Sequence, residues 1–474
     1  MSVRRARTPI GVDKRQFLIL LIVFVINNLT SRGQPPQTIS IEEAARRMLA
    51  IGLREERAFE MLRGLIGAAG SRLTGSPGAE AALDHMRQVM LDLGFSNVHR
   101  EPVTVNRWER GTETAQVEAS PQRAAVELAV CALGGSVGTS EAGIKAPVIE
   151  VRSFEELKSQ KQAARGKIVF FNQPMDRTIL EPFRAYGANA DHRVRGAAEA
   201  AKCGAVAVII RSLTFRRDRF PHTGLMRYED GVPRIPAAAV ATEDADRLSG
   251  LLGENSELLI HLTLGCRDLG PVESANLIGD LRGSERPEEI ILIGGHVDAW
   301  DLGPGAHDDG AGCVQSVEAL RLIRAVGLVP KRTIRAVLFM DEEFGGTGGR
   351  FYARAPERKG EKHLVAFESD RGGFLPLAVG LGGSPGLIQK HQAWSPLIKS
   401  LGLVQGLVSG GGGVDIAPLA EQGVILGGLI PDAGRYFDFH HSALDDLAAV
   451  HPRELELGAI ALAVTATIIA QEGI

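Results

Sequence analysis

The chain has few aromatic residues and no excess of basic residues. Only 5% of its 474 residues are aromatic, and 53 basic residues stand against 57 acidic ones. Without a basic excess the chain has no electrostatic footprint for nucleic acid, so we exclude that partner. The apolar fraction of 44% is ordinary for a soluble globular protein. At this length we expect two domains, or one domain with an insertion.

Cysteine is also scarce, and its spacing excludes two kinds of site. The four cysteines are Cys131, Cys203, Cys266 and Cys313. None lies in a CxxC pair, so neither a zinc ribbon nor a dithiol redox motif is present. We interpret them as small buried side chains, with one disulfide left open for an exported protein.

The N-terminus lacks an apolar run long enough to cross a membrane. Phe17–Ile26 is ten residues long, whereas a span needs about 20. Five basic residues precede it, as in a secretory signal peptide, although no A-x-A cleavage pattern follows. We therefore predict a signal peptide over residues 1–30 and an exported protein, whether secreted, periplasmic or lumenal. An uncleaved anchor is the alternative, and only then do we expect membrane association.

What the chain does have is a strand followed by metal-ligand residue types. Ile290–Ile293 is a β-branched apolar run that ends in two glycines, which indicates a buried strand of a parallel sheet. His296, Asp298 and Asp308 follow, where open α/β sheets carry their sites. Taken alone, Asp308 and Asp309 would equally fit capping residues at the start of a helix, where acidic side chains are favoured.

Three further strand ends favour a metal site. Lys331–Met340 is followed by Glu342 and Glu343, His363–Glu368 by Asp370, and a later segment, YFDFHHS, contains His441. Imidazole and carboxylate groups are the ligands that catalytic zinc takes. Five ligands with one shared carboxylate give three protein ligands to each of two metals, as in a co-catalytic hydrolytic site.

Four segments carry a resemblance to a known family: GGHVDAWDLGPGAHDDGAG, MDEEFGGTG, FESDRGG and FHHS. Together they resemble the co-catalytic zinc peptidases of the bacterial leucyl aminopeptidase family, over roughly residues 41–472. The resemblance implies two Zn²⁺ ions per chain. One would be held by His296, Asp308 and Asp370, and the other by Asp308, Glu343 and His441.

The resemblance also implies roles beside the metals. Glu342 would be the general base, and Asp298 would orient His296 from behind. His441 is preferred to His440 because the family's ligand directly precedes a Ser or Thr. The family further implies a cis peptide bond between Asp308 and Asp309.

For the fold, the resemblance implies a three-layer α/β/α sandwich with a mixed central sheet, formed by residues 41–119 and 271–474. The strands at 290–294, 333–340 and 363–368 should be neighbours in that sheet. Residues 120–270 contain short strands and no candidate metal cluster. They resemble the protease-associated domain that some members of the family carry as an insert, and we expect a separate β-rich domain there.

We therefore predict an exported zinc exopeptidase or dipeptidase that hydrolyses small peptides with a metal-activated water. The sequence leaves open whether it is a carboxypeptidase, an aminopeptidase or a dipeptidase. One alternative is a non-catalytic binding protein on the same scaffold, and another is a single-zinc aminoacyl cyclase or deacylase. The full ligand set and Glu342 argue against both. A homodimer is compatible with the sequence.

Overall fold

The computed structural model describes residues 39–355, 358–383, 389 and 392–474. The predicted signal peptide over residues 1–30 lies outside the described part. Residues 41–474 form one compact unit, which contains two eight-stranded sheets.

The first sheet contains the strands predicted to carry the site. Its order is β1 (Ser96–Glu109), β10 (Arg267–Leu281), β12 (Arg332–Phe339), β11 (Arg286–His296), β13 (Lys362–Glu368), β16 (Ile425–Pro431), β14 (Pro376–Leu381) and β15 (Gly406–Ser409). The central strands β12, β11, β13 and β16 are parallel, whereas β1, β10 and β14 join through antiparallel pairs. The mixed sheet is therefore confirmed, as is the adjacency of the strands at 290–294, 333–340 and 363–368.

Helices cover both faces of this sheet. Ile278 of β10 packs in one apolar cluster with Tyr352 of α10 (Thr347–Arg354). The next residue, Gly279, faces Met90 of α4 (Pro77–Asp92). Since successive strand residues point to opposite faces, α10 and α4 lie on opposite sides of the sheet.

The other α-helices in the described residues of this part are α2 (Ile41–Glu55), α3 (Arg57–Ala69), α9 (Ala311–Ala325), α12 (Ser395–Ser400) and α13 (Pro452–Glu472). Helix α13 is apolar and long enough to cross a membrane by composition, but 83% of its apolar window is buried inside the protein, largely against α9 and α2. Its hydrophobicity is thus accounted for by the core. Ser76 caps α4 by accepting a hydrogen bond from the Ala79 N–H.

The second sheet has the order β3 (Val126–Leu128), β2 (Glu113–Val117), β9 (Leu259–Leu264), β5 (Ile144–Val151), β6 (Ile168–Phe171), β7 (Ala207–Arg211), β8 (Ala237–Val240) and β4 (Val130–Ala132). Its helices are α5 (Phe154–Ser159), α6 (Lys161–Ala164), α7 (Pro182–Lys202) and α8 (Thr242–Glu254). We call residues 113–264 the insert region.

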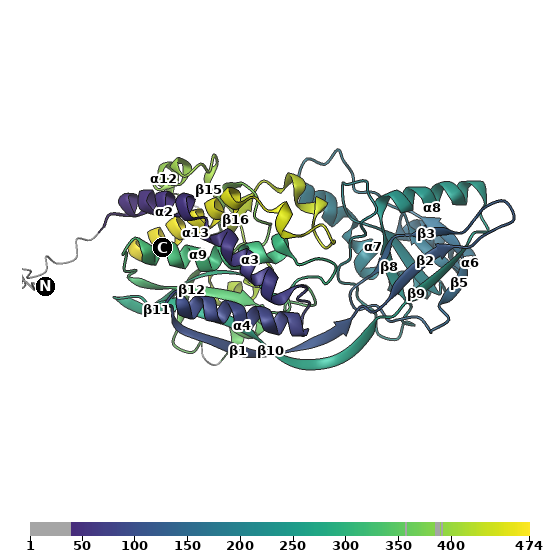
Figure 1. Cartoon of the computed structure of the whole chain (residues 1–474), viewed down its shortest axis with the longest axis horizontal. Coiled ribbons are helices and arrows are strands. Elements are labelled where there is room, and N and C mark those ends of the chain that lie inside the picture. The colour runs from purple at the N-terminus through teal and green to yellow at the C-terminus, as the bar shows by residue number, and fades with distance from the viewer. Residues whose placement is uncertain (1–38, 356–357, 384–388, 390–391) are drawn as a thin grey trace, which may run out of the picture. The chain divides into compact units, whose positions relative to one another are not determined.

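The insert region differs from the prediction in two respects. It begins at Glu113 rather than 120, because β2 pairs with β9 and not with the first sheet. It also carries long helices, including the 21-residue α7, so it is α/β in character rather than only β-rich. Strands β1 and β10, paired side by side in Figure 1, carry the chain into and out of this region. Its independence as a domain stays a prediction.

Candidate metal centre

The predicted ligands meet at the carboxyl ends of the central strands. His296 is the last residue of β11, Glu343 follows β12, and Asp370 follows β13. Because these strands are parallel, their ends lie at one edge of the sheet. Asp308 precedes α9, and the bond between Asp308 and Asp309 is cis, which confirms that prediction.

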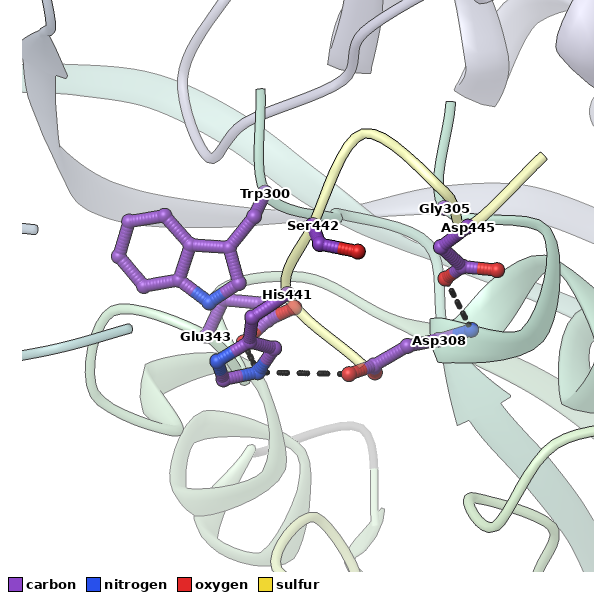
Figure 2. A pocket seen from close by; sticks show the side chains of 7 residues that line it. All are labelled: Trp300, Gly305, Asp308, Glu343, His441, Ser442 and Asp445. Atoms are coloured by element: carbon purple, nitrogen blue, oxygen red, sulfur yellow. Dashed lines mark hydrogen bonds and ion pairs between the residues drawn. The ribbon is translucent and has the colours of Figure 1, made fainter. Parts of the chain in front are cut away.

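Two sets of side chains share Asp308. His296 Nε2 lies 3.2 Å from Asp308 Oδ1 and 3.5 Å from Asp370 Oδ1. On the other side, His441 Nε2 lies 3.3 Å from Asp308 Oδ2 and 3.1 Å from Glu343 Oε2. Figure 2 shows Asp308, Glu343 and His441 converging in this way. Each set has three donors, and the two oxygens of Asp308 face different sets.

His440 is a competitor for the last position. Its Nε2 lies 3.7 Å from Asp308 Oδ2, and Asp308, His440 and His441 have potential ligand atoms within 4.8 Å of one another. However, among the described residues His440 forms no ion pair with Glu343, whereas His441 does. The His440 ring instead packs among Tyr186, Tyr436 and Phe437. The geometry therefore favours His441 as the ligand.

The hydrogen bonds of both histidines leave Nε2 free for a metal. His296 Nδ1 lies 3.0 Å from the Asp298 carbonyl oxygen, and His441 Nδ1 lies 3.3 Å from that of Thr223. A carbonyl only accepts, so each ring carries a proton on Nδ1, and in its neutral form each ring would present a lone pair at Nε2. His296 Nε2, Glu343 Oε1 and Asp370 Oδ1 are buried without a hydrogen-bond partner. Lone pairs facing buried carboxylates fit a divalent cation such as Zn²⁺.

Electrostatics supports the same assignment. Burial by itself would lower the pKa of both histidines, but neighbouring carboxylates raise the pKa of His296 well above its usual value and that of His441 to about 9. Burial, together with nearby carboxylates, raises the pKa of Glu342 and Asp370. In the metal-free protein, imidazolium protons thus supply the positive charge, and metal binding would displace them.

Asp298 contacts His296 mainly through its main chain. Its main-chain oxygen contacts His296 Nδ1, whereas its carboxylate lies 3.7 Å from that atom. The carboxylate instead accepts hydrogen bonds from Thr74 Oγ1 at 2.5 Å and from the main-chain N–H groups of residues 341–343. Asp298 therefore holds the turn that carries Glu342 and Glu343.

Glu342 lies beside the ligands without joining either set closely. Its Oε2 is 4.0 Å from His296 Nε2, and it lines a cavity of about 340 Å³ together with Asp308, Glu343 and Asp370. This position suits a proton acceptor that faces the substrate.

Asp445 and Asp309 hold the bridging segment. Asp445 accepts hydrogen bonds from the main-chain N–H groups of His307 (2.6 Å) and Asp308 (3.0 Å). Asp309 accepts from those of His296 and Gly312. His307 stacks on Phe374 and lies outside the ligand sets. All four cysteines are buried, as predicted, and unpaired, so the disulfide that the sequence left open does not form.

Sequence reasoning missed the contribution of the insert region to the cavity. Phe183, Tyr186 and Arg193 of α7, with Leu225, line it together with the metal ligands. The Tyr186 ring packs on Phe437 at 4.6 Å. No local motif could have revealed this, since an arginine in a helix is ordinarily solvated and only the tertiary fold brings α7 to the site.

A set of two histidines and three carboxylates, one of them a shared aspartate, at the edge of a mixed α/β sheet defines a metallohydrolase site. Residues 276–465 match the profile of peptidase family M28. The chain is 36% identical to carboxypeptidase Q of Mus musculus over 94% of this chain and 93% of that protein. It is 37% identical to carboxypeptidase Q of Homo sapiens over 91% and 89%. The chain therefore belongs to peptidase family M28 and is a metallopeptidase.

Solved structures agree with this assignment. A peptidase M28 precursor from Shewanella amazonensis superposes with a TM-score of 0.86 at 34% identity, over 92% of this chain and 97% of that one. A zinc aminopeptidase from Bacillus subtilis gives a TM-score of 0.64 at 19% identity, over 88% and 95%, and shares the fold.

Proposed function

We propose that the protein is an exported, zinc-dependent exopeptidase or dipeptidase that cleaves small peptides at a dinuclear site. The observation that carries the proposal is the pair of three-donor sets that share Asp308 beside one cavity. Export rests on the N-terminal sequence pattern alone.

Each metal would have three protein ligands, with Asp308 common to both. His296, Asp308 and Asp370 would hold one ion, and Asp308, Glu343 and His441 the other. When bound, two such cations polarise the scissile carbonyl and acidify a water molecule. The carboxylates of the chain fix where these charges sit, and Asp445 keeps the backbone of Asp308 in place.

Glu342 would act as the general base. It lines the cavity, its Oε2 lies 4.0 Å from His296 Nε2, and it belongs to neither of the two ligand sets. It would accept the proton of the attacking water and pass it to the leaving amine. A carboxylate with a raised pKa is better able to hold that proton between the two steps.

Arg193 supports recognition of a carboxylate terminus. Its side chain is buried, and among the described residues no carboxylate lies within ion-pair distance of it. Of the described residues that line the cavity, it is the one cationic side chain apart from histidines, and every lining carboxylate belongs to the metal set or is Glu342. A free substrate carboxylate would pair with this guanidinium. This favours carboxypeptidase or dipeptidase action over aminopeptidase action.

The test combines metal analysis with a dipeptide panel. We expect two zinc ions per chain and faster hydrolysis of peptides with a free carboxylate than of their amidated forms. Equal rates on both forms would refute carboxylate recognition. Absence of turnover by zinc-loaded protein would favour a non-catalytic binding protein.

A further inference from the structure

We propose that His222 and Thr223 of the insert region support one of the two metal sites, the one formed by Asp308, Glu343 and His441. We further propose that Arg110 is a positioning residue that fixes this support. The inference rests on the two-metal assignment of the proposed function, and it concerns how one site is held.

Two short segments far apart in sequence pair through their main chains. The Thr223 N–H donates to the His441 carbonyl at 3.0 Å, and His441 Nδ1 lies 3.3 Å from the Thr223 carbonyl oxygen. Beside them, His222 Nδ1 lies 2.6 Å from the His440 carbonyl oxygen. The insert region thus sets the direction of the His441 ring and leaves its Nε2 free to bind a metal.

Arg110 joins this segment to the loop between His296 and Asp308. Its guanidinium donates to Asp301 Oδ1 at 2.9 and 2.6 Å and to the Ala132 carbonyl at 2.5 Å, and its Nη2 lies 3.4 Å from Thr223 Oγ1. The Thr223 hydroxyl donates to the same Ala132 carbonyl at 2.8 Å. The buried Arg110 therefore joins the loop between His296 and Asp308 to the segment that contains His222 and Thr223.

Close packing of Gly134 and Trp300 limits movement of the segment that contains His222 and Thr223 relative to His441. Gly134 lies next to the segment that contains His222 and Thr223, and a Cβ added at Gly134 would lie 1.9 Å from the Trp300 ring. The Trp300 ring in turn lies 5.7 Å from that of His441, and Figure 2 shows the two together at the pocket. The Gly134 N–H also donates to the Gly224 carbonyl at 3.0 Å, which ties the loop at Gly134 to the segment that contains His222 and Thr223.

The other metal site does not depend on the insert region in this way. His296 Nδ1 contacts the carbonyl of Asp298, which is only two residues further along the same loop. Asp370 follows β13 of the first sheet. Loss of the Arg110 contacts should therefore weaken one site and spare the other.

The experiment titrates metal-free protein with Zn²⁺ against a chromophoric chelator and uses no substrate. We expect two tight equivalents for the wild type. Arg110→Met and Asp301→Asn should each keep one equivalent unchanged and weaken the other about 10- to 100-fold, the usual effect of removing an outer-shell partner. Arg267→Met is the matched control, because Arg267 pairs with Glu109 nearby but is 70% exposed, and both equivalents should stay.

Two backgrounds identify the weakened site. With Asp370→Asn, which disables the site of His296, Arg110→Met should weaken the remaining zinc; with His441→Ala it should leave the remaining zinc unchanged. Thr223→Val removes only hydroxyl contacts and should weaken the same site less, which keeps the test decisive if Arg110→Met fails to fold. Unchanged affinities, or equal weakening of both sites, would overturn the inference. Fewer than two equivalents in the wild type would instead defeat the two-metal assignment beneath it.

Discussion

The rings of His440 and His441 stack on each other with centroids 3.5 Å apart, yet only His441 reaches two carboxylates of the site. Two adjacent histidines thus have different surroundings: one faces Asp308 and Glu343, and the other sits in an aromatic cluster. Backbone conformation separates them, since His441 has a φ of 60°.

This contrast gives the first prediction. His441→Ala should lose one of the two zinc ions, because it removes a direct ligand, whereas His440→Ala should keep both. Zinc content after dialysis, measured by mass spectrometry, distinguishes the two variants. The opposite pattern would make His440 the ligand.

The second prediction concerns Glu342. Glu342→Gln should retain the zinc content and lose about 10²- to 10⁴-fold in kcat, since it removes the proton acceptor and preserves the shape. Glu285→Gln is the control, because Glu285 is an exposed partner of Lys331 far from the ligand set. Near-normal turnover of zinc-loaded Glu342→Gln would mean that another group is the base.

The third prediction concerns Arg193. Arg193→Met should lower kcat/KM for a dipeptide with a free carboxylate by roughly 10- to 100-fold, the worth of about 1.5–3 kcal/mol for hydrogen bonds to a charged group. Hydrolysis of the amidated dipeptide should change little. Arg195→Met, two residues further along α7 and 54% exposed, removes the same charge as a control. If both substrates lose equally, Arg193 has a structural role instead.

The fourth prediction concerns stability against pH, at a site remote from the metals. Glu456 of α13 is buried, accepts a hydrogen bond from the Ala58 N–H and lies beside the Glu318–Arg321 ion pair. Burial and the neighbouring Glu318 raise the pKa of Glu456 from 4.5 to about 9. Folding therefore favours the protonated acid, so its stabilising contribution is complete below about pH 4.5 and is lost as the pH rises through about 9.

Glu456→Gln keeps a neutral acceptor at that position and cannot ionise. Relative to the wild type, the variant should gain stability at pH 9 compared with pH 6, in urea unfolding of metal-free protein. Gln122→Glu on an exposed turn would control for general charge effects. The same difference between variant and wild type at both pH values would contradict the shifted pKa.

Much of the site could be predicted from sequence because its residues are local to strand ends. The runs at β11, β12 and β13 are apolar and bounded by glycines and acids, so both the strands and the positions after them are readable. Parallel pairing then brings His296, Glu343 and Asp370 together. The cis bond after Asp308 followed from the resemblance of the same motif.

Other features depended on contacts between distant segments, which leave no local pattern. The insert region begins at Glu113 and not at the predicted residue 120, because β2 pairs with β9, which lies more than 140 residues later in the sequence. The carboxylate of Asp298 turned to the main chain of residues 341–343 because those N–H groups are buried there and need acceptors.

The sequence by itself determined the chemistry of this protein: the ligand types, their order along the chain and the sheet that carries them. Only the tertiary structure decided what surrounds that chemistry. Arg193 lines the cavity of the ligands, and Thr223 contacts His441, because packing of α7 and the neighbouring loops places them there. Such placement is set by burial and by contacts across more than 200 residues. His296, Glu343 and Asp370, by contrast, can each be predicted from the end of one strand and the turn after it.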